Sequence, residues 1–432
     1  MLLHGWGRYP RSECDIAFPA SESECAQSLG RRPLIPRGMG RSYGDSSLGD
    51  AVISTRYLDH FRSFDPATGL LRCAAGVTLA DVLRTFVPKG WFPAVTPGTS
   101  FVSIGGAIAS DVHGKNHHRD GTFTDHLLEM EVLLGDGRRV KASRTENEDL
   151  FHATCGGMGL TGIILEATLR LRPLPSGSMV QTALKLPHLD AALEAFETHA
   201  QSSYSVAWID CTAHGPKLGR SVLFLGEHDT QGPLDYRERT RLAVPIEAPS
   251  FATGSTALRC FNALYYARAR AKASTRRVSL ADYFYPLDAI QDWNRLYGRA
   301  GLLQHQFVLP VQSAARGLRT ILERVAASGC GSFLAVLKKF GAANDHFLSF
   351  PMAGYTLALD FKAGPRELAL LDALDEVVID HGGRIYLAKD ARMTQQVFRA
   401  SYPRWHEFEA VRARWNAHGR FASRQSRRLG LQ

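Results

Sequence analysis

The sequence predicts an α+β fold with more than one domain, in which helices pack over an antiparallel sheet. A chain of 432 residues exceeds one ordinary domain. Short strand and helix patterns alternate over the first 175 residues, and longer ones alternate in the region that follows. Between the two regions, Pro173, Pro175 and the run Ser176–Ser178 interrupt both patterns. We therefore expect a domain boundary there.

Strict alternation predicts one strand over residues 162–172. Its apolar side holds Ile163, Leu165, Ala167, Leu169 and Leu171, and its polar side holds Glu166, Thr168, Arg170 and Arg172. Such alternation is typical of a strand with one buried face. We expect further strands at 129–134, 204–210, 221–227, 332–340 and 355–361. Helical spacing predicts helices at 189–199, 314–328 and 366–380.

Composition and charge narrow the function classes. With 45% hydrophobic and 22% charged residues, the chain can form a sizeable core. Its net charge of +9 favours an anionic partner: nucleic acid, a membrane surface or a phosphorylated substrate. Its seven cysteines are scattered without a CxxC pair, which argues against a disulfide framework and a structural zinc site. Without a secretory leader or a long apolar run, a cytoplasmic protein is expected, with membrane contact only at its periphery.

A basic stretch lies between Glu247 and Asp282, where no acidic residue occurs. Its six basic residues are Arg259, Arg268, Arg270, Lys272, Arg276 and Arg277. One interpretation is a solvated helix or loop. The other is a docking surface for anionic lipid, with apolar contacts from Phe261, Leu264, Tyr265 and Tyr266. No nucleic-acid-binding motif accompanies the stretch, so nucleic acid is not the expected partner.

Two glycine-rich runs, 37–45 and 96–118, point to a large phosphate-containing cofactor. Glycines at 98, 105 and 106 let a ligand approach the main chain where a Cβ would block it. Ser100 or Ser103 can cap a short helix at 105–110, whose free N–H groups would favour phosphate. Nearby, Asp111, His113, Lys115, His117 and His118 supply groups able to transfer protons.

The first run is a near miss for the dinucleotide-binding fingerprint. Gly38 and Gly40 fit, but Gly44 comes one place too late, although Asp59 lies where a ribose-binding acid would be expected. Pro33 and Pro36 also interrupt the strand that should precede the loop. A Rossmann NAD site is therefore disfavoured.

Longer strings resemble a known family. RGMGRSYGD (37–45), TPGTSFVSIGGAIASDVHGKNHH (96–118) and GGMGLTGII (156–164) resemble the flavin-binding domain of the vanillyl-alcohol-oxidase type. Within that superfamily, the resemblance is to the branch that oxidises polyprenyl-phosphate ribose. It continues through YSVAWIDC (204–211), GRSVLFLGEH (219–228), LQHQFVLP (303–310), LAVLKKFG (334–341), YLAKDARM (386–393) and FASRQSRRLGL (421–431).

The resemblance implies a split cofactor domain that binds FAD. Residues 1–174 and 384–432 would form this domain, and 175–383 the substrate domain. The implied FAD contacts are Gly38, Met39, Gly40, Arg41, Ser42, Tyr43, Thr96, Pro97, Gly98, Gly105, Gly106, His113 and Tyr386. Some members bond the flavin covalently to a histidine, but Arg41 occupies the matching position. We therefore expect FAD to be bound non-covalently.

The implied reaction is oxidation of the ribose 2′-hydroxyl to a ketone, followed by reduction to the arabinose form by a separate NAD(P)H-dependent short-chain reductase. By resemblance, the substrate pocket is lined by Lys115, Gln304, Gln306, Lys338 and Lys389. Lysines would hold the phosphate of the polyprenyl-phosphate sugar, and glutamines would orient its hydroxyls. The alternatives are an FAD-dependent alditol or aldonolactone oxidase acting on a soluble sugar and, more remotely, a non-enzymatic basic binding protein.

Three residues are candidates for the base that takes the hydroxyl proton. His113 suits by its intrinsic pKa, whereas Lys115 or Lys389 would need a pKa lowered by burial or by neighbouring positive charge. We expect Lys389 to lie closest to the reacting carbon, with His113 supporting it.

Other polar residues have simpler interpretations. His117 and His118 are polar loop residues rather than metal ligands, so no metal is expected. Lys338 and Lys339 end a strand, where lysine is often simply solvated, and Asp390 can pair with Lys389 or Arg392. His305 stands where close relatives commonly have tyrosine, so the detailed shape of the pocket can differ from theirs.

Overall fold

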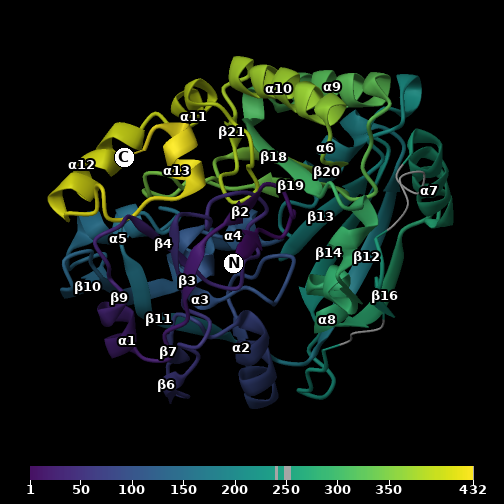
Figure 1. Cartoon of the computed structure of the whole chain (residues 1–432). Helices are drawn as coiled ribbons and strands as arrows, with labels where there is room; N and C mark the ends of the chain where they lie inside the picture. Colours follow the sequence, from purple (N-terminus) through teal and green to yellow (C-terminus); the bar gives the residue numbers. More distant parts are fainter. Residues whose placement is uncertain (239–241, 248–253, 432) are drawn as a thin grey trace.

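The computed structural model describes residues 1–238, 242–247 and 254–431, and sheets of three, six and eight strands organise them (Figure 1). The expected α+β fold is confirmed. The small parallel sheet has β5 (Ala51–Ser54) between β3 (Asp15–Ala17) and β4 (Leu34–Arg37). Because β4 ends at Arg37, the first glycine run leaves the carboxyl end of a parallel strand. The hairpin β1 (Leu2–His4) and β2 (Arg11–Glu13) precedes this sheet, and α1 (Glu22–Gln27) follows β3.

The six-stranded sheet is antiparallel. Along the sheet it runs β10 (Arg139–Ser143), β9 (Leu127–Leu133), β11 (Ile163–Pro173), β7 (Leu70–Ala74) and β6 (Phe61–Asp65), and β8 (Trp91–Pro93) pairs with the end of β11. The short helices around it are α2 (Leu79–Phe86), α3 (Ile104–Ala109), α4 (His117–Asp120) and α5 (Glu148–Thr154).

Strand β11 corrects one expectation. Its apolar residues are buried as predicted, but Glu166 on the opposite side is only 5% exposed. The carboxylate of Glu166 is buried because Arg62 and Arg72 both donate to it. These two charged partners compensate for the loss of water around the carboxylate. The alternating pattern therefore predicted more solvent exposure for this face of β11 than the structure has.

The eight-stranded antiparallel sheet follows in the chain. Its order is β16 (Ser274–Ser279), β12 (Ser178–Leu186), β14 (Ser221–His228), β13 (Tyr204–Ile209), β19 (Ala335–Phe340), β20 (Gly354–Lys362), β18 (Leu302–Pro310) and β21 (Arg384–Ile385). The predicted strands are all present, although the one expected at 332–340 begins only at Ala335.

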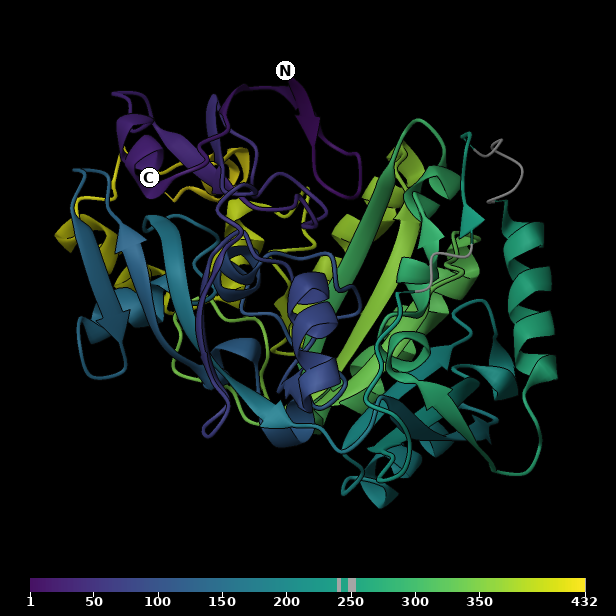
Figure 2. The ribbon, with the colours of Figure 1, turned by 90° about the horizontal axis from the view of Figure 1, so that it is seen from below.

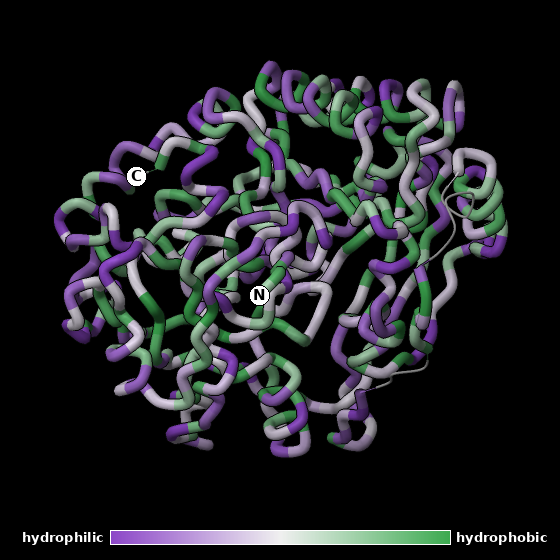
Figure 3. Tube along the Cα trace, viewed as in Figure 1, coloured by the Kyte–Doolittle hydropathy of each residue, from purple (hydrophilic) through white to green (hydrophobic). Residues whose placement is uncertain are grey.

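Helices cover one face of the large sheet (Figure 1). They are α6 (Leu189–Thr198), α9 (Val311–Ser328) and α10 (Pro365–Asp380), close to the predicted ranges. Leu318, Ile321, Leu322 and Val325 of α9 are buried, and hydrophobic and hydrophilic residues alternate along α9 and α10 in Figure 3. The other face of the sheet turns toward the N-terminal part of the chain.

The C-terminal segment returns to the N-terminal part. Its helices are α11 (Gln395–Ser401), α12 (Trp405–Arg414) and α13 (Arg424–Leu429), beside the N-terminal strands in Figure 1. Main-chain hydrogen bonds join them, because the N–H of Leu34 donates to Arg420 and that of Ala422 donates to Leu34. Chain ends far apart in sequence therefore build one side of the molecule.

The basic stretch forms an outer helix and an edge strand. Helix α7 (Ser255–Arg268) stands at the outer edge of the molecule in Figure 2, and β16 follows it. Residues 248–253 of the stretch lie outside the described residues. Beyond β16 come α8 (Leu280–Phe284), η5 (Pro286–Ala289), β17 (Ile290–Gln291), which pairs with β15 (Leu242–Ala243), and η6 (Trp293–Tyr297).

Candidate active site

The candidate site lies between the glycine runs and the face of the large sheet that α6, α9 and α10 leave uncovered. We call this the uncovered face. Neighbouring strands contribute side chains to this face at alternate positions: Gln304 and Gln306 on β18, Lys338 on β19, and Thr356 and Asp360 on β20. Gln304 is opposite Asp360 in the register, and Lys338 is opposite Thr356. The loop after β21 brings Tyr386 and Lys389 to the same place, since Tyr386 N–H donates to Gln306 O.

The first glycine run presents free main-chain donors. Within the described residues, the N–H groups of 38–42 make no hydrogen bond to protein, whereas the N–H of Tyr43 donates to Ala388. Gly40 has a φ of +65°, a conformation that favours glycine. Successive free N–H groups in such a loop form a concave anion-binding surface. This loop fits the pyrophosphate of FAD.

Close approach explains two further glycines of the cradle. A Cβ at Gly38 would lie 2.1 Å from the hydroxyl oxygen of Ser103, and one at Gly44 would lie 1.9 Å from the Asp390 carbonyl oxygen. At Gly98, by contrast, a Cβ would meet no described atom within 4 Å, so the main chain there borders open space. Arg41 lies at the same loop, with its guanidinium 4.4 Å from the Trp6 ring centroid and its buried Nε without a partner among the described residues. These features fit a bound flavin nucleotide.

The second glycine run corrects an expectation. Ser103, one of the two candidates, caps α3 by accepting from Gly106 N–H. The N–H groups of Ile104 and Gly105 donate to Val77 and Ala75. The helix therefore has no free N–H at these positions, and the expectation that its start would attract phosphate is wrong. The turn that follows β7 has taken those donors, which leaves residues 38–42 as the better phosphate cradle.

Three lysines surround the site, and the structure gives none of them an ion-pair partner among the described residues. Burial lowers the pKa of Lys338 to about 8. Burial and the nearby Lys338 lower the pKa of Lys115 to about 7. The ammonium of Lys115 donates to the Tyr283 carbonyl and lies 4.4 Å from that ring's centroid. Buried cations without anions are costly, so an anionic ligand would stabilise this arrangement.

Lys389 lies against Tyr43, with Nζ 3.8 Å from the ring centroid. Burial lowers the pKa of Lys389, Asp360 raises it, and Lys338 lowers it further. Asp360 is 1% exposed and accepts a hydrogen bond from Gln304, which also donates to the Tyr43 hydroxyl at 3.4 Å. A network of Lys389, Tyr43, Gln304 and Asp360 thus lines one side of the site.

His113 is brought to the site, but with a different chemistry from the one expected. The Gln306 amide donates to its Nε2 at 3.0 Å, and the rings of Phe340, Phe350 and Tyr386 surround it. Burial, followed by Lys338, lowers the pKa of His113 well below its usual value. The ring is therefore neutral and a weak base. Its intrinsic pKa gave a misleading signal because the sequence does not reveal complete burial among cations.

Several polar residues of the second run serve the fold. Asp111 is buried and accepts from Thr124, Asn344 and Ser349. His117 accepts from Gly341 N–H, and burial lowers its pKa to about 4. His118 bonds to the Ser202 carbonyl. Within the described ranges, no group of His, Cys, Asp and Glu side chains is arranged to hold a metal ion.

Residues next to the predicted site residues face elsewhere. Lys339 pairs with Glu197, and His305 points toward α10, where its Nε2 lies 2.9 Å from Asp375. His305 therefore does not shape the pocket directly. The carboxylate of Asp390 forms an ion pair with Arg428 at 2.9 Å and accepts from main-chain N–H groups. The expected pairing with Lys389 or with the Arg392 side chain is not among the ion pairs of the described residues.

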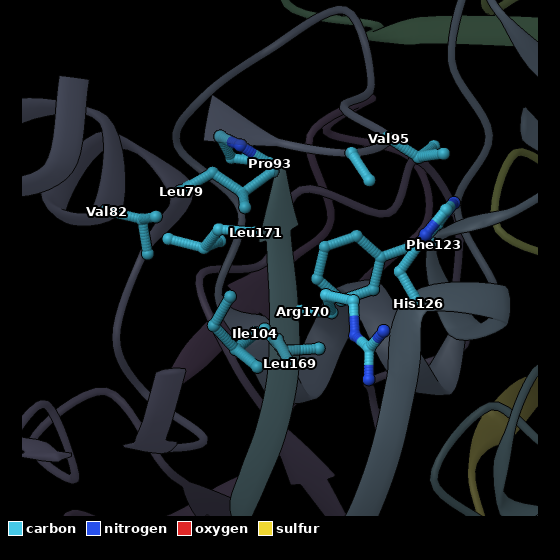
Figure 4. A pocket seen from close by; sticks show the side chains of 11 residues that line it. Leu79, Val82, Pro93, Val95, Ile104, Phe123, His126, Leu169, Arg170 and Leu171 are labelled. Atoms are coloured by element: carbon cyan, nitrogen blue, oxygen red, sulfur yellow. The ribbon is translucent and has the colours of Figure 1, made fainter. Parts of the chain in front are cut away.

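Two kinds of residue were missed in the sequence. Asp360 is the lone acid in the apolar strand 355–361, a signal that could have identified it. Phe340 and Phe350, whose rings contact His113, resemble ordinary core residues in the sequence. No sequence pattern could have identified them as site residues. A small apolar pocket elsewhere, beside α2 and β11, contains none of the predicted site residues; Leu79, Val82, Leu169 and Leu171 are among those that line it (Figure 4).

Comparisons with known proteins indicate the family to which the chain is related. Residues 16–143 match a family described as FAD binding domain. The decaprenylphosphoryl-β-D-ribose oxidase of Mycolicibacterium smegmatis is 36% identical, over 99% of this chain and 97% of that protein. An uncharacterised protein of Streptomyces coelicolor is 32% identical, over 82% of this chain and all of its own length. Cytokinin dehydrogenase 7 of rice is 31% identical, over 37% of this chain and 33% of its own.

The fold and the match to an FAD binding domain define an FAD-dependent oxidoreductase that acts on CH–OH groups. More particularly, the chain belongs to the decaprenylphosphoryl-β-D-ribose oxidase family. None of the helices in the described part of the chain has the length and apolar character needed to cross a bilayer.

Proposed function

We propose that the protein oxidises the 2′-hydroxyl of a polyprenyl-phosphate ribose to the ketone. The observation that carries this proposal is a group of three half-buried lysines beside a cradle for FAD: Lys115, Lys338 and Lys389, none of which has an ion-pair partner among the described residues. A sugar phosphate supplies the missing negative charge and a hydroxyl to oxidise. The family relationship to a decaprenylphosphoryl-β-D-ribose oxidase supports the same substrate class.

FAD, when bound, supplies the acceptor for the hydride that leaves the carbinol carbon. The free N–H groups of residues 38–42 would hold its pyrophosphate, and Thr96, Pro97, Gly98, Gly105 and Gly106 would border it. Tyr43, His113 and Tyr386 would lie near the flavin. Because no histidine occupies position 41, we propose that the cofactor is non-covalent and can be removed by mild denaturation.

Lys389 is the proposed base. Burial lowers the pKa of Lys389 to about 7, which makes its neutral amine accessible near physiological pH, and a neutral amine can accept the hydroxyl proton. His113 instead positions the substrate, because its neutral ring is held by Gln306 between aromatic side chains. Lys115 and Lys338 hold the phosphate as point charges, while Gln304 and Gln306 orient the sugar hydroxyls.

The proposed division of the chain follows the same roles. Residues 1–174 and 384–432 would bind FAD, and 175–383 would bind the substrate. Expression of 175–383 alone tests the division: an independently folded fragment should show a cooperative unfolding transition and no flavin binding. A fragment without such a transition would contradict it.

Anaerobic mixing of the holo-protein with candidate substrates tests the function. We expect a polyprenylphosphoryl ribose to bleach the flavin, and soluble alditols and aldonolactones to leave it oxidised. The same ribose glycoside without a phosphate is the matched control, because it lacks the group that the lysines are proposed to bind. Bleaching by an alditol or a lactone, but not by the phospholipid sugar, would support the soluble-sugar oxidase instead.

We further propose that the product ketone passes to a separate NAD(P)H-dependent short-chain reductase. The family relationship supports this partner because oxidation alone leaves the sugar at the keto stage. The purified protein with polyprenylphosphoryl ribose should accumulate the ketone, and the arabinose form should appear only when reductase and NAD(P)H are added. Formation of arabinose without them would contradict the proposal.

Contact with an anionic membrane is the remaining proposal, and the exposed side of α7 supports it. Phe261 and Leu264 are 42% and 55% exposed on this helix, and Arg259 and Arg268 flank them. Such an apolar and basic surface suits anionic lipid headgroups. Tyr266 contributes less than expected, because its half-buried hydroxyl donates to Leu186.

Co-sedimentation with vesicles tests the membrane contact. We expect the holo-protein to bind vesicles that contain phosphatidylglycerol and to ignore purely zwitterionic ones. Replacing the six basic residues of the stretch by glutamine should abolish binding, whereas Arg277→Gln alone should weaken it little because Arg277 is paired with Asp229. Equal binding by the six-residue variant would contradict this proposal.

A further inference from the structure

Among the described residues that line the candidate site, Asp360 is the one that carries a carboxylate. It lies on β20, opposite Gln304 in the register, and is 1% exposed. Its carboxylate accepts from the Gln304 amide, while Ser332 binds only its main-chain N–H. A buried acid with so little compensation needs a partner or a function.

The charged and titratable groups around Asp360 come from every element that packs against it. The Gln304 amide that donates to Asp360 also donates to the Tyr43 hydroxyl at 3.4 Å, and Lys389 Nζ lies 3.8 Å from the centroid of the Tyr43 ring. Asp360 therefore interacts electrostatically with Lys389 from the loop after β21, with Tyr43 from the first glycine run and with Tyr297 from η6. Lys338 and His113 lie beyond, facing Lys389. The hydroxyl of Tyr297 is buried without a hydrogen-bond partner among the described residues. Lys389 is thus the cation that this carboxylate can stabilise.

We propose that Asp360 is a positioning residue that stabilises protonated Lys389 during the reaction. The O–H bond of the substrate would break and an N–H bond would form at Lys389 Nζ, while the electrons of the O–H bond form the second bond of the ketone. FAD, when bound, would supply the acceptor for the hydride that leaves the carbinol carbon. The new ammonium lies in a site with two other lysines. The carboxylate of Asp360 offsets that repulsion, and the Gln304 hydrogen bond holds it in place.

Electrostatics distinguish Lys389 from its neighbours. Asp360 raises the pKa of Lys389, whereas burial alone lowers that of Lys338. Burial raises the pKa of Asp360 itself, which Gln304 and Lys389 lower. Removing the acid should therefore affect the pKa of Lys389 more than that of either other lysine.

The inference deepens the proposed role of Lys389, but its test needs no substrate. The pH dependence of acetic anhydride labelling at Lys389, read by mass spectrometry in the holo-protein, reports the protonation of that amine. For Asp360→Asn we expect the labelling midpoint to fall by about one pH unit or more, because an opposite charge is lost. Asp372→Asn removes an exposed acid of α10 and should leave the midpoint unchanged.

A second variant covers the case in which Asp360→Asn fails to retain flavin. Gln304→Met removes the hydrogen bond that favours the carboxylate of Asp360, so the Lys389 midpoint should fall in the same direction by a smaller amount. An unchanged or higher midpoint in the folded variants would overturn the inference. Labelling that shifts as expected, in a protein whose flavin no sugar phosphate bleaches, would instead refute the proposed function alone.

Discussion

Two buried charge clusters lie on opposite faces of the eight-stranded sheet, and they are built differently. On the α10 side, Asp375 accepts from Arg392 through both carboxylate oxygens and lies 2.9 Å from His305. On the site side, Lys389 and Lys338 have no ion-pair partner among the described residues, and Asp360 accepts only from Gln304 through its carboxylate.

The difference separates structure from function. A buried ion pair with its hydrogen bonds satisfied fixes how α10 packs on the sheet and leaves nothing for a ligand to do. A face with excess desolvated cations is costly unless an anion compensates them. That cost is offset when an anionic substrate binds, so we assign the unpaired face to the substrate and the paired face to stability.

The largest effect should come from Lys389→Ala. Loss of the base should slow anaerobic flavin reduction by polyprenylphosphoryl ribose by about 10³-fold, in the range typical of a lost general base. FAD absorbance of the purified variant should be unchanged, because the side chain is not part of the 38–42 cradle. Reduction at the wild-type rate would remove Lys389 from the mechanism.

Asp375→Asn tests the paired face. Leaving Arg392 with less compensation should lower the free energy of unfolding by about 3 kcal/mol, measured by urea denaturation with FAD present. The rate of flavin reduction per folded molecule should stay at the wild-type value. A large loss of activity with unchanged stability would reverse the roles assigned to the two faces.

Adjacent lysines on β19 give a matched pair. Lys338→Ala should raise KM for the phospholipid sugar by about 30-fold, as expected for a lost charged hydrogen bond. Lys339→Ala should change KM by less than about threefold, since Lys339 forms only a surface ion pair with Glu197. Equal effects in steady-state kinetics would place the phosphate elsewhere.

Lys115 should make stability depend on pH. Its pKa is lowered from 10.5 to about 7 in the folded protein, so between these values the unfolded chain binds more protons than the folded one. The free energy of unfolding should therefore rise with pH across that window and lose this contribution as pH falls through about 7. Lys115→Met should flatten the slope in urea titrations between pH 7 and pH 10.5, and an unchanged slope would show that the lysine is not desolvated.

Local patterns predicted the strands and helices well, because each depends on neighbours along the chain. Glu166 and the start of α3 were misjudged because their partners, Arg62, Arg72, Val77 and Ala75, belong to other strands and loops. Asp360 was missed for the same reason, since only the β18–β20 register places it beside Gln304. The altered pKa of His113 needs burial, which no local pattern gives.

A crystal structure of the holo-protein with a non-oxidisable substrate analogue, polyprenylphosphoryl 2-deoxyribose, tests the central claim most directly. We predict the phosphate between Lys115 and Lys338, and the sugar carbon 2 beside Lys389 on the uncovered face of the sheet. A phosphate bound away from these lysines, with their side chains still unpaired, would contradict the assignment.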